Sequence, residues 1–543
     1  MTNEIVRYKN IAKDLFKENK LLLVFLGLVC FLGFGFTITH NSIGIDNTAY
    51  DVYLESRAVI GQGRPAPLLI NLIFGSYGIN PFWSNAFGVL ILYFSVILWS
   101  VLFMRVGKEK ISKGALIIFA LIMVSYPMIN EHFIFVPFTF AICYGLTAIS
   151  LMAIYEAYKA KKIVLYLLPI FLITFIISMN ESFVPVVLCG IFFILILEYI
   201  KKENEKTTLK HCLKLLLVTI LVIVIALGLE ALITSILRKV ITHTPLGAGN
   251  TVSWFKYPIL YSLKTLVLGF VYRYILAAYW YSPIAVFLAS GFLGVVIAIF
   301  LAIKKKQPII LLLMFGLLIS VISLHLISGH IVPYRANPSF AVFIGFVLML
   351  IMMMLKPHWL KVCYGVIIMV LVVNQTRILN KWFVNDYQRY EKDKEIAVEV
   401  AMSIERDFDQ TKPIVFVGET AMAPQVEKVS ANGRPIIGWS IVSFDFRAMQ
   451  FHNFLEYHGH QLNKASGEQY DEGKALAGNM PDYPNKGYIK ELDEFIVVNF
   501  GDNYKWILCE KEEKVEKWIL DVLENMTNMD REYLVGQLAT SIN

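Results

Sequence analysis

The sequence has few cysteines and lacks several motifs that identify common enzyme classes. Its six cysteines are scattered without a CxxC pair, so neither a disulfide framework nor a zinc site of the usual spacing is predicted. There is no GxSxG nucleophile elbow, and residues 375–543 contain no glycine-rich phosphate loop that opens a helix. No small-residue cleavage site follows the first apolar run, which is therefore predicted to be an uncleaved anchor rather than a signal peptide.

Charged residues are also scarce. They make up 17% of the chain, against 57% hydrophobic residues, and the mean hydropathy is +0.60. This composition requires several membrane spans. The net charge of +7 comes from short lysine and arginine clusters between apolar runs, as expected of cytoplasmic anchors and not of a nucleic-acid-binding surface.

Eleven apolar segments are long enough to cross a bilayer. They lie near residues 20–38, 83–104, 114–129, 135–155, 163–179, 182–200, 215–236, 283–303, 308–328, 337–355 and 358–374. Basic clusters alternate with loops that lack lysine and arginine, so the positive-inside rule places the N-terminus in the cytoplasm and residues 375–543 outside.

Residues 257–280 are apolar enough to be a further span, which would invert every later side. Lys264 and Arg273 interrupt this segment, however, and its many tyrosines resemble an interfacial belt. We therefore assign it to helices that lie along the outer surface, within residues 237–282.

The predicted fold is a polytopic α-helical membrane domain over residues 1–374, followed by a small extracytoplasmic α/β domain over residues 375–543. The second domain is predicted from the strand-like runs at 413–418 and 494–501 and from helix-like stretches between and after them.

Polar and ionisable residues gather at the outer ends of the predicted spans, where burying them is costly and a functional role is the default hypothesis. The candidates are Asp46, Asn47, Asp51 and Arg64 in the first outer loop (39–82), Asn180 and Glu181 in the third, and His330 and Arg335 in the fifth. Asp46 is the candidate general base, although an aspartate at this position could instead simply cap the helix that follows.

The other candidates are assigned to substrate binding. Arg64 and Arg335 are each followed closely by proline and lie on the side that the positive-inside rule disfavours, which favours phosphate binding over anchoring by snorkelling. Asn180 and Glu181 are candidates for binding hydroxyl groups, and Glu181 would also suit a helix N-terminus.

Two further features of the outer loops give weaker signals. Glu131 and His132 in the second loop are more often structural in such a turn. Asp46 and Asp51 are oxygen donors, so a divalent cation such as Mg²⁺ or Mn²⁺ is left open as a cofactor, although no metal site is predicted.

Four segments together carry a family resemblance. They are "GQGRPAPLLINLIFG" after the first-loop acid, the "MNES" turn, "VPYRANPSF" before a late span, and "NQTRILNKWFVNDYQRYEKD" at the entry to the hydrophilic tail. With these the chain resembles the O-antigen-modifying glucosyltransferases of bacteria and phages, within the wider GT-C class of polytopic glycosyltransferases. The first-loop signature of that family usually reads as two adjacent acids, whereas Asn47 follows Asp46 here.

The resemblance implies a glucosyltransferase of the bacterial cytoplasmic membrane. It would move a hexose, most simply glucose, from a polyprenyl-phosphate donor to a cell-surface glycan on the outer face. Asp46 would be the base, while Arg64 and Arg335 would stabilise the leaving phosphate. A flippase and a synthase of the lipid-linked donor are the partners that the resemblance implies.

Two other classes of function remain open at this point. A lipid-linked sugar transporter would place its substrate groups near the bilayer midplane on broken helices, often within inverted repeats. Here the polar groups lie at the outer ends of the spans, and the two halves of the chain show no correspondence. The third class is a non-catalytic partner in polysaccharide assembly, with residues 375–543 as its docking module.

Overall fold

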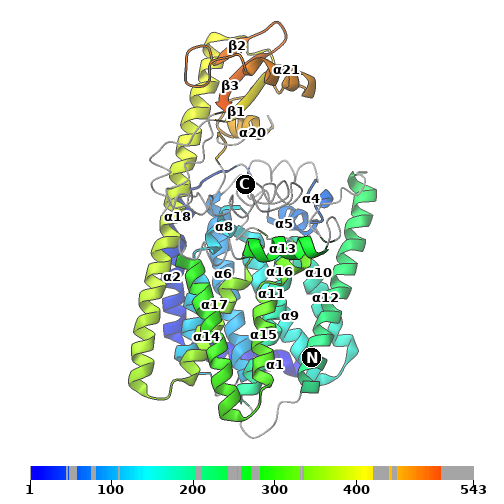
Figure 1. The fold of residues 1–543 in the computed structure, drawn as a ribbon, viewed down its shortest axis with the longest axis vertical. Helices are drawn as coiled ribbons and strands as arrows, with labels where there is room; N and C mark the ends of the chain where they lie inside the picture. The colour runs from blue at the N-terminus through cyan, green and yellow to red at the C-terminus, as the bar shows by residue number, and fades with distance from the viewer. Residues whose placement is uncertain are drawn as a thin grey trace.

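The fold consists of a bundle of long helices and a small domain beyond one end of it (Figure 1). The computed structural model describes residues 2–44, 47, 58–74, 81–107, 111–135, 137–201, 209–242, 254, 259–270, 282–329, 332, 336–419, 440–442 and 449–502. We call the end of the bundle that faces the small domain the domain end, and the end near the N-terminus the far end.

Every predicted span falls on a helix of the bundle. These helices are α2 (Lys20–Thr39), α6 (Pro81–Gly107), α7 (Lys113–Ser125), α9 (Pro137–Ala160), α10 (Leu167–Met179), α11 (Val184–Lys201), α12 (Leu209–Leu237), α14 (Ser282–Lys305), α15 (Ile309–Val321), α17 (Ser339–Met354) and α18 (His358–Asp407). Among the described residues, seven helices are long and apolar enough to cross a membrane, and four shorter apolar helices coincide with the remaining predictions. The chain is therefore a polytopic membrane protein, while the crossing of the shorter helices stays a prediction.

The bundle helices differ in how much of their surface they bury. The apolar window of α11 is 83% buried against its neighbours, whereas that of α12 is only 22% buried. The exposed side chains of α12 are large and apolar, such as Leu217, Val224 and Leu232. A helix satisfies its own backbone hydrogen bonds in lipid, so α12 can face lipid without other helices packed around it. The more buried α11 lies at the centre of the bundle.

Short helices cover both ends of the bundle. At the far end lies α1 (Thr2–Glu18), together with the turn η2 (Ile163–Tyr166). The domain end carries α4 (Ala58–Gly61), α5 (Ala66–Phe74), α8 (Ile129–Phe135), α13 (Ile259–Phe270) and α16 (Ser323–Ser328), with the 3₁₀-helix η3 (Glu181–Phe183) and the short π-helix η4 (Arg238–Thr242). The first outer loop (39–82) thus contains the two short helices α4 and α5.

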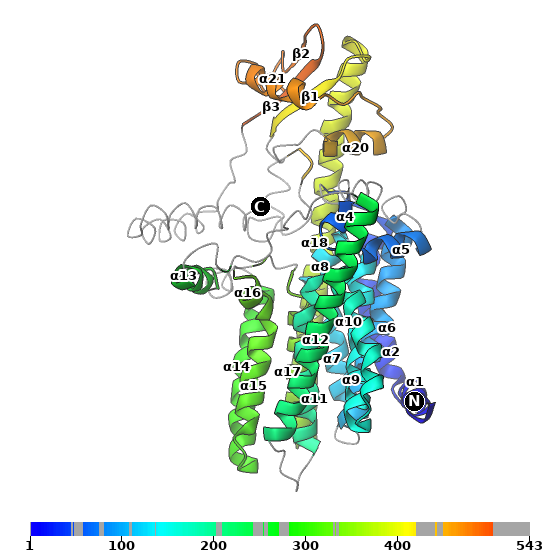
Figure 2. The same ribbon diagram turned by 90° about the vertical axis from the view of Figure 1, so that its right-hand side faces the viewer.

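The helix α13 lies within the ambiguous segment 257–280 and runs across the bundle. It is seen from the side in Figure 1 and almost end-on in Figure 2, so its axis is roughly perpendicular to the long helices. This orientation suits a helix on the membrane surface, although Arg273 and the rest of 271–280 lie outside the described residues.

The small domain contains a three-stranded sheet in the order β1-β3-β2. The strand β1 (Ile414–Glu419) pairs in parallel with β3 (Ile496–Asp502), and β2 (Ile489–Glu491) pairs antiparallel with β3. Parallel pairing needs a crossover, which includes α20 (Met449–Tyr457) and α21 (Gly467–Ala477). The strands predicted at 413–418 and 494–501 are thus β1 and β3.

The helix α18 belongs to both parts of the molecule. It runs unbroken from His358 to Asp407, so the predicted domain boundary at 374/375 falls inside a helix. Beyond the apolar window its buried residues recur at helical spacing, as at Ile396, Val400 and Ile404, and they pack against the sheet. The two parts are therefore connected by a helix rather than by a flexible linker (Figure 2).

Candidate active site

The structure describes four of the eight predicted site residues. They are Asn47, Arg64, Asn180 and Glu181. The predicted base Asp46 and the predicted substrate-binding residues Asp51, His330 and Arg335 lie outside the described residues.

Arg64 and Glu181 form a two-point ion pair at the domain end. The Arg64 Nη2 lies 2.7 Å from Glu181 Oε1, and its Nε donates to Oε2 at 3.2 Å. The two side chains are 38% and 40% exposed although they come from loops 117 residues apart. The structure thus joins the predicted phosphate-binding cation to the predicted hydroxyl-binding acid, in a geometry that fits a guanidinium fork on a carboxylate.

Local structure holds this pair in place on both sides. The Arg64 N–H donates to the carbonyl of Val59 at 2.9 Å, which closes the turn after α4. On the other side, Asn180 Oδ1 accepts a hydrogen bond from the Ser182 N–H at 3.0 Å and so caps η3. Asn180 therefore has a capping role at the start of the turn that carries Glu181, and its predicted contact with substrate stays a prediction.

Another arginine in this region was not predicted from the sequence to be a site residue. Arg238, at the start of η4, donates from Nε to the carbonyl of Ile60 at 3.1 Å and also bonds to the carbonyl of Gly61. It is 7% exposed and so holds α4 from within the protein. Arg64 was singled out because it lies on the side that the positive-inside rule disfavours and is followed by proline; Arg238, just after a predicted span, has the first of these two signals.

The acid and base of the second outer loop are buried in α8. Glu131 is 5% exposed and His132 is 3% exposed. The His132 ring stacks on Phe140 with a centroid separation of 3.8 Å. A stacked, buried ring fits the structural interpretation of His132 better than a role in direct contact with substrate.

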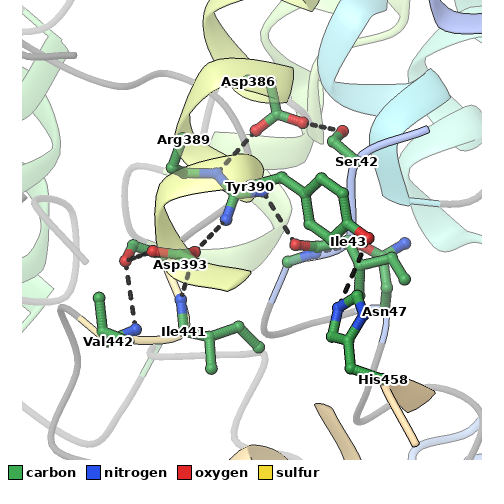
Figure 3. Close-up of polar contacts among 12 residues, drawn as sticks. Ser42, Ile43, Asn47, Asp386, Arg389, Tyr390, Asp393, Ile441, Val442 and His458 are labelled. Atoms are coloured by element: carbon green, nitrogen blue, oxygen red, sulfur yellow. Dashed lines mark hydrogen bonds and ion pairs between the residues drawn. The ribbon is translucent and has the colours of Figure 1, made fainter. Parts of the chain in front are cut away.

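A buried ionic cluster on α18 holds the start of the first outer loop (Figure 3). The Arg389 guanidinium donates to Asp386 Oδ1 at 2.9 Å, to Asp393 Oδ2 at 2.6 Å and to the backbone carbonyl of Ile43 at 3.0 Å. Ser42 Oγ donates to the second oxygen of Asp386. We call Asp386, Arg389 and Asp393 the α18 cluster.

The α18 cluster also holds a segment of the C-terminal domain. Asp393 accepts hydrogen bonds from Ser440 Oγ at 2.6 Å and from the Ile441 N–H at 2.9 Å. The three charged side chains of the cluster are at most 1% exposed. Two carboxylates share one guanidinium here. Ser42 of the first outer loop and residues 440–441 of the C-terminal domain donate the remaining hydrogen bonds that buried charges require.

Asn47 directly follows the predicted base in the sequence and is hydrogen-bonded to Gly44. Its Oδ1 accepts from the Gly44 N–H at 2.9 Å, and its own N–H donates to the Gly44 carbonyl at 3.1 Å. Ile43 packs into the core of the C-terminal domain beside Tyr390, whose hydroxyl lies 3.5 Å from His458 Nε2. Positions 44 and 47 are thus joined to each other, and the chain just before them is fixed to α18.

The sequence contained a signal for the α18 cluster. Its members stand at i, i+3 and i+7 in "NDYQRYEKD", a spacing that places them on one face of a helix. What the spacing could not indicate is the partner, because the carbonyl of Ile43 is 346 residues away.

The comparisons with known proteins identify the family. The family model for glucosyl transferase GtrII matches residues 35–352, which is more than half of the chain. The match includes the first outer loop and both members of the Arg64–Glu181 pair but ends before α18. The searches of curated proteins and of solved structures gave no match. The chain therefore belongs to the GtrII glucosyl transferase family and is a membrane glycosyltransferase.

Proposed function

We propose that this glucosyltransferase moves glucose from a polyprenyl-phosphate donor to a cell-surface glycan, with Asp46 as general base. The observation that carries the proposal is the anchoring of the first outer loop. The Arg389 guanidinium binds the carbonyl of Ile43, close to Asp46 in the chain, and Gly44 is bonded to Asn47 just beyond it. A general base must be held in place relative to its substrate, and such anchoring suits that role.

The proposed step is a single displacement at the anomeric carbon. Asp46 takes the proton of an acceptor hydroxyl, whose oxygen attacks the anomeric carbon while the bond from that carbon to the phosphate oxygen breaks. The lipid phosphate leaves with the bonding electrons. The configuration at the anomeric carbon is inverted, because the nucleophile enters opposite the leaving group.

The Arg64–Glu181 pair is assigned to the sugar phosphate. A guanidinium stabilises negative charge that develops on a leaving phosphate, and a carboxylate accepts hydrogen bonds from sugar hydroxyls. Both side chains are more than one third exposed, so substrate can reach them without unfolding the loops that carry them. Arg335 is assigned to the same phosphate on sequence grounds.

The family assignment favours this function over a flippase or an assembly partner, since the family is one of glucosyl transferases. The orientation remains part of the proposal. We place the domain end on the outer side of the cytoplasmic membrane. Two features support this orientation: basic clusters lie at the far end, and the loops near 130 and 180 lack lysine and arginine.

Replacing the proposed base tests the mechanism. In Asp46→Asn we expect glucose transfer from a polyprenyl-phosphate donor to fall by about 10²–10⁴-fold, since the amide cannot accept the proton. The same change at Asp471, an exposed aspartate on α21, is the matched control and should leave transfer unchanged. Transfer by the Asp46→Asn protein at the control rate, with normal membrane insertion, would exclude Asp46 as the base.

Cysteine labelling tests the orientation. In a cysteine-free background, a cysteine at exposed position 471 should react with a membrane-impermeant thiol reagent added to intact cells, whereas one at position 304 should not. Lys304 lies at the far end of α14, in the basic cluster that the positive-inside rule places in the cytoplasm. Labelling at position 304 but not at position 471 would show that the far end lies outside the cell and the domain end in the cytoplasm.

A further inference from the structure

A cavity of about 1220 Å³ lies at the far end of the bundle. It is bounded by α1 and by the ends of α6, α9 and α11, with η2 and the start of α10 along one side. The Arg64–Glu181 pair and the α18 cluster both lie at the other end, so the cavity has no part in the proposed transfer step.

Six basic residues line this cavity, and we call them together the cationic wall. They are Arg7, Arg105, Lys113, Lys159, Lys162 and Lys201. The acids in the lining are Asp14, Glu18 and Glu156, so six positive charges against three negative ones leave a net charge of +3. A cationic concavity with this excess of positive charge attracts a phosphate-bearing group.

Buried contacts hold the cationic wall in shape. Arg105 Nη2 lies 2.9 Å from Glu156 Oε1, and these side chains are only 8% and 14% exposed. The Tyr8 hydroxyl donates to the same carboxylate at 3.0 Å, which fixes α1 to α9. The cavity is therefore built into the fold and is more than a gap between mobile lysines.

A second part of the lining, which we call the apolar wall, begins just after Lys162 and is continuous with the lipid-facing surface. It includes Val164, Leu165, Leu167 and Leu168. Val164 and Leu167 are 65% and 64% exposed, and the adjacent Ile163 is 87% exposed. In a membrane protein such side chains face acyl chains, so this wall opens towards the bilayer.

We propose that the cavity binds an anionic membrane phospholipid. Its phosphate lies against the cationic wall, and one acyl chain runs along Val164–Leu168. The two walls match the two halves of such a lipid, whereas a soluble phosphate would use only the first. The charge excess selects an anionic headgroup over a zwitterionic one of similar size.

Binding of lipids to the full-length protein in detergent tests the proposal. Native mass spectrometry is expected to detect phosphatidylglycerol retained at lower lipid concentrations than phosphatidylcholine. In Lys162→Gln the retention of phosphatidylglycerol should weaken about fivefold, because one cation near the headgroup is lost. Lys162→Arg keeps the charge and should retain wild-type binding.

The matched control is the neighbouring lysine. Lys161 is exposed like Lys162 but does not line the cavity, so Lys161→Gln changes the net charge equally and should leave retention unchanged. Equal retention of the two lipids, or equal weakening in both variants, would overturn the proposal. Release of the bound lipid by inorganic phosphate at matched concentration would overturn the choice of a lipid over a soluble anion.

Discussion

Within the part of the chain that the structure describes, two arginine–carboxylate sites at the domain end of the bundle differ in burial. The side chains of Arg64 and Glu181 are 38% and 40% exposed, whereas those of the α18 cluster are at most 1% exposed. The exposed site joins two loops, and the buried site joins a loop, a helix and a segment of the C-terminal domain.

The difference in burial indicates different roles for similar chemistry. An exposed ion pair contributes about 0–1 kcal/mol to stability, so it can exchange its partner for a substrate at little cost. A buried charge that loses its partner costs about 3–5 kcal/mol, so the α18 cluster cannot open during turnover without destabilising the fold. We therefore assign substrate contact to the exposed pair and positioning to the buried cluster.

The largest expected effect is that of breaking the buried cluster. Arg389→Gln leaves the carboxylates of Asp386 and Asp393 buried without their cation, so we expect a loss of about 3–5 kcal/mol of stability. Thermal unfolding in detergent would measure this loss. A change below about 1 kcal/mol, typical of surface pairs, would remove the distinction between the two sites.

A variant in which all three charges are removed separates stability from positioning. In Asp386→Asn, Arg389→Met, Asp393→Asn no charge of the cluster remains, so much of the lost stability should return. Transfer should stay low, because the carbonyl of Ile43 still lacks its donor. Recovery of both stability and transfer would show that Arg389 has no positioning role.

A smaller loss of stability is expected at low pH, when His452 in the core of the C-terminal domain becomes protonated. Burial lowers the pKa of His452 to about 4, and its Nε2–H donates to the Ile414 carbonyl at 3.2 Å. The unfolded chain, with a histidine pKa of about 6.5, binds more protons between these values. Stability from this residue is complete above about pH 6.5 and is lost as the pH falls towards 4, by up to about 3 kcal/mol.

Unfolding of the C-terminal domain, followed by pulse proteolysis between pH 7 and pH 5, would measure this loss. His452→Gln cannot titrate and should have a shallower pH dependence than the wild type, even if it is less stable throughout. The same slope in both proteins would assign the acid sensitivity to other groups.

The smallest effect on stability is expected at the exposed pair. Arg64→Gln should change the unfolding free energy by less than about 1 kcal/mol, because the pair is partly solvated. It should nevertheless reduce kcat/KM for the lipid-linked donor by about 10²-fold, through loss of charge stabilisation at the phosphate. Arg64→Lys keeps the charge but loses the forked guanidinium, so its kcat/KM should lie between those of the wild type and Arg64→Gln. A large loss of stability with normal transfer would make this pair structural.

Much of the architecture could be predicted from the sequence. Each span is specified by its own run of apolar side chains, as in residues 182–200, which form α11. Strands β1 and β3 were also predicted from short local runs. The continuation of α18 through residue 375 was missed, because the apolar window ends there and an amphipathic pattern takes over.

The sequence alone identifies a polytopic membrane protein of the GtrII glucosyl transferase family, because hydropathy and family motifs are properties of local segments. It also indicated Arg64 and Glu181 as unusual residues. The folded structure was needed to show that these two residues are partners and that Arg389 holds the chain just before Asp46. Those contacts join positions 117 and 346 residues apart, and such pairings depend on how the helices pack rather than on any pattern within one segment.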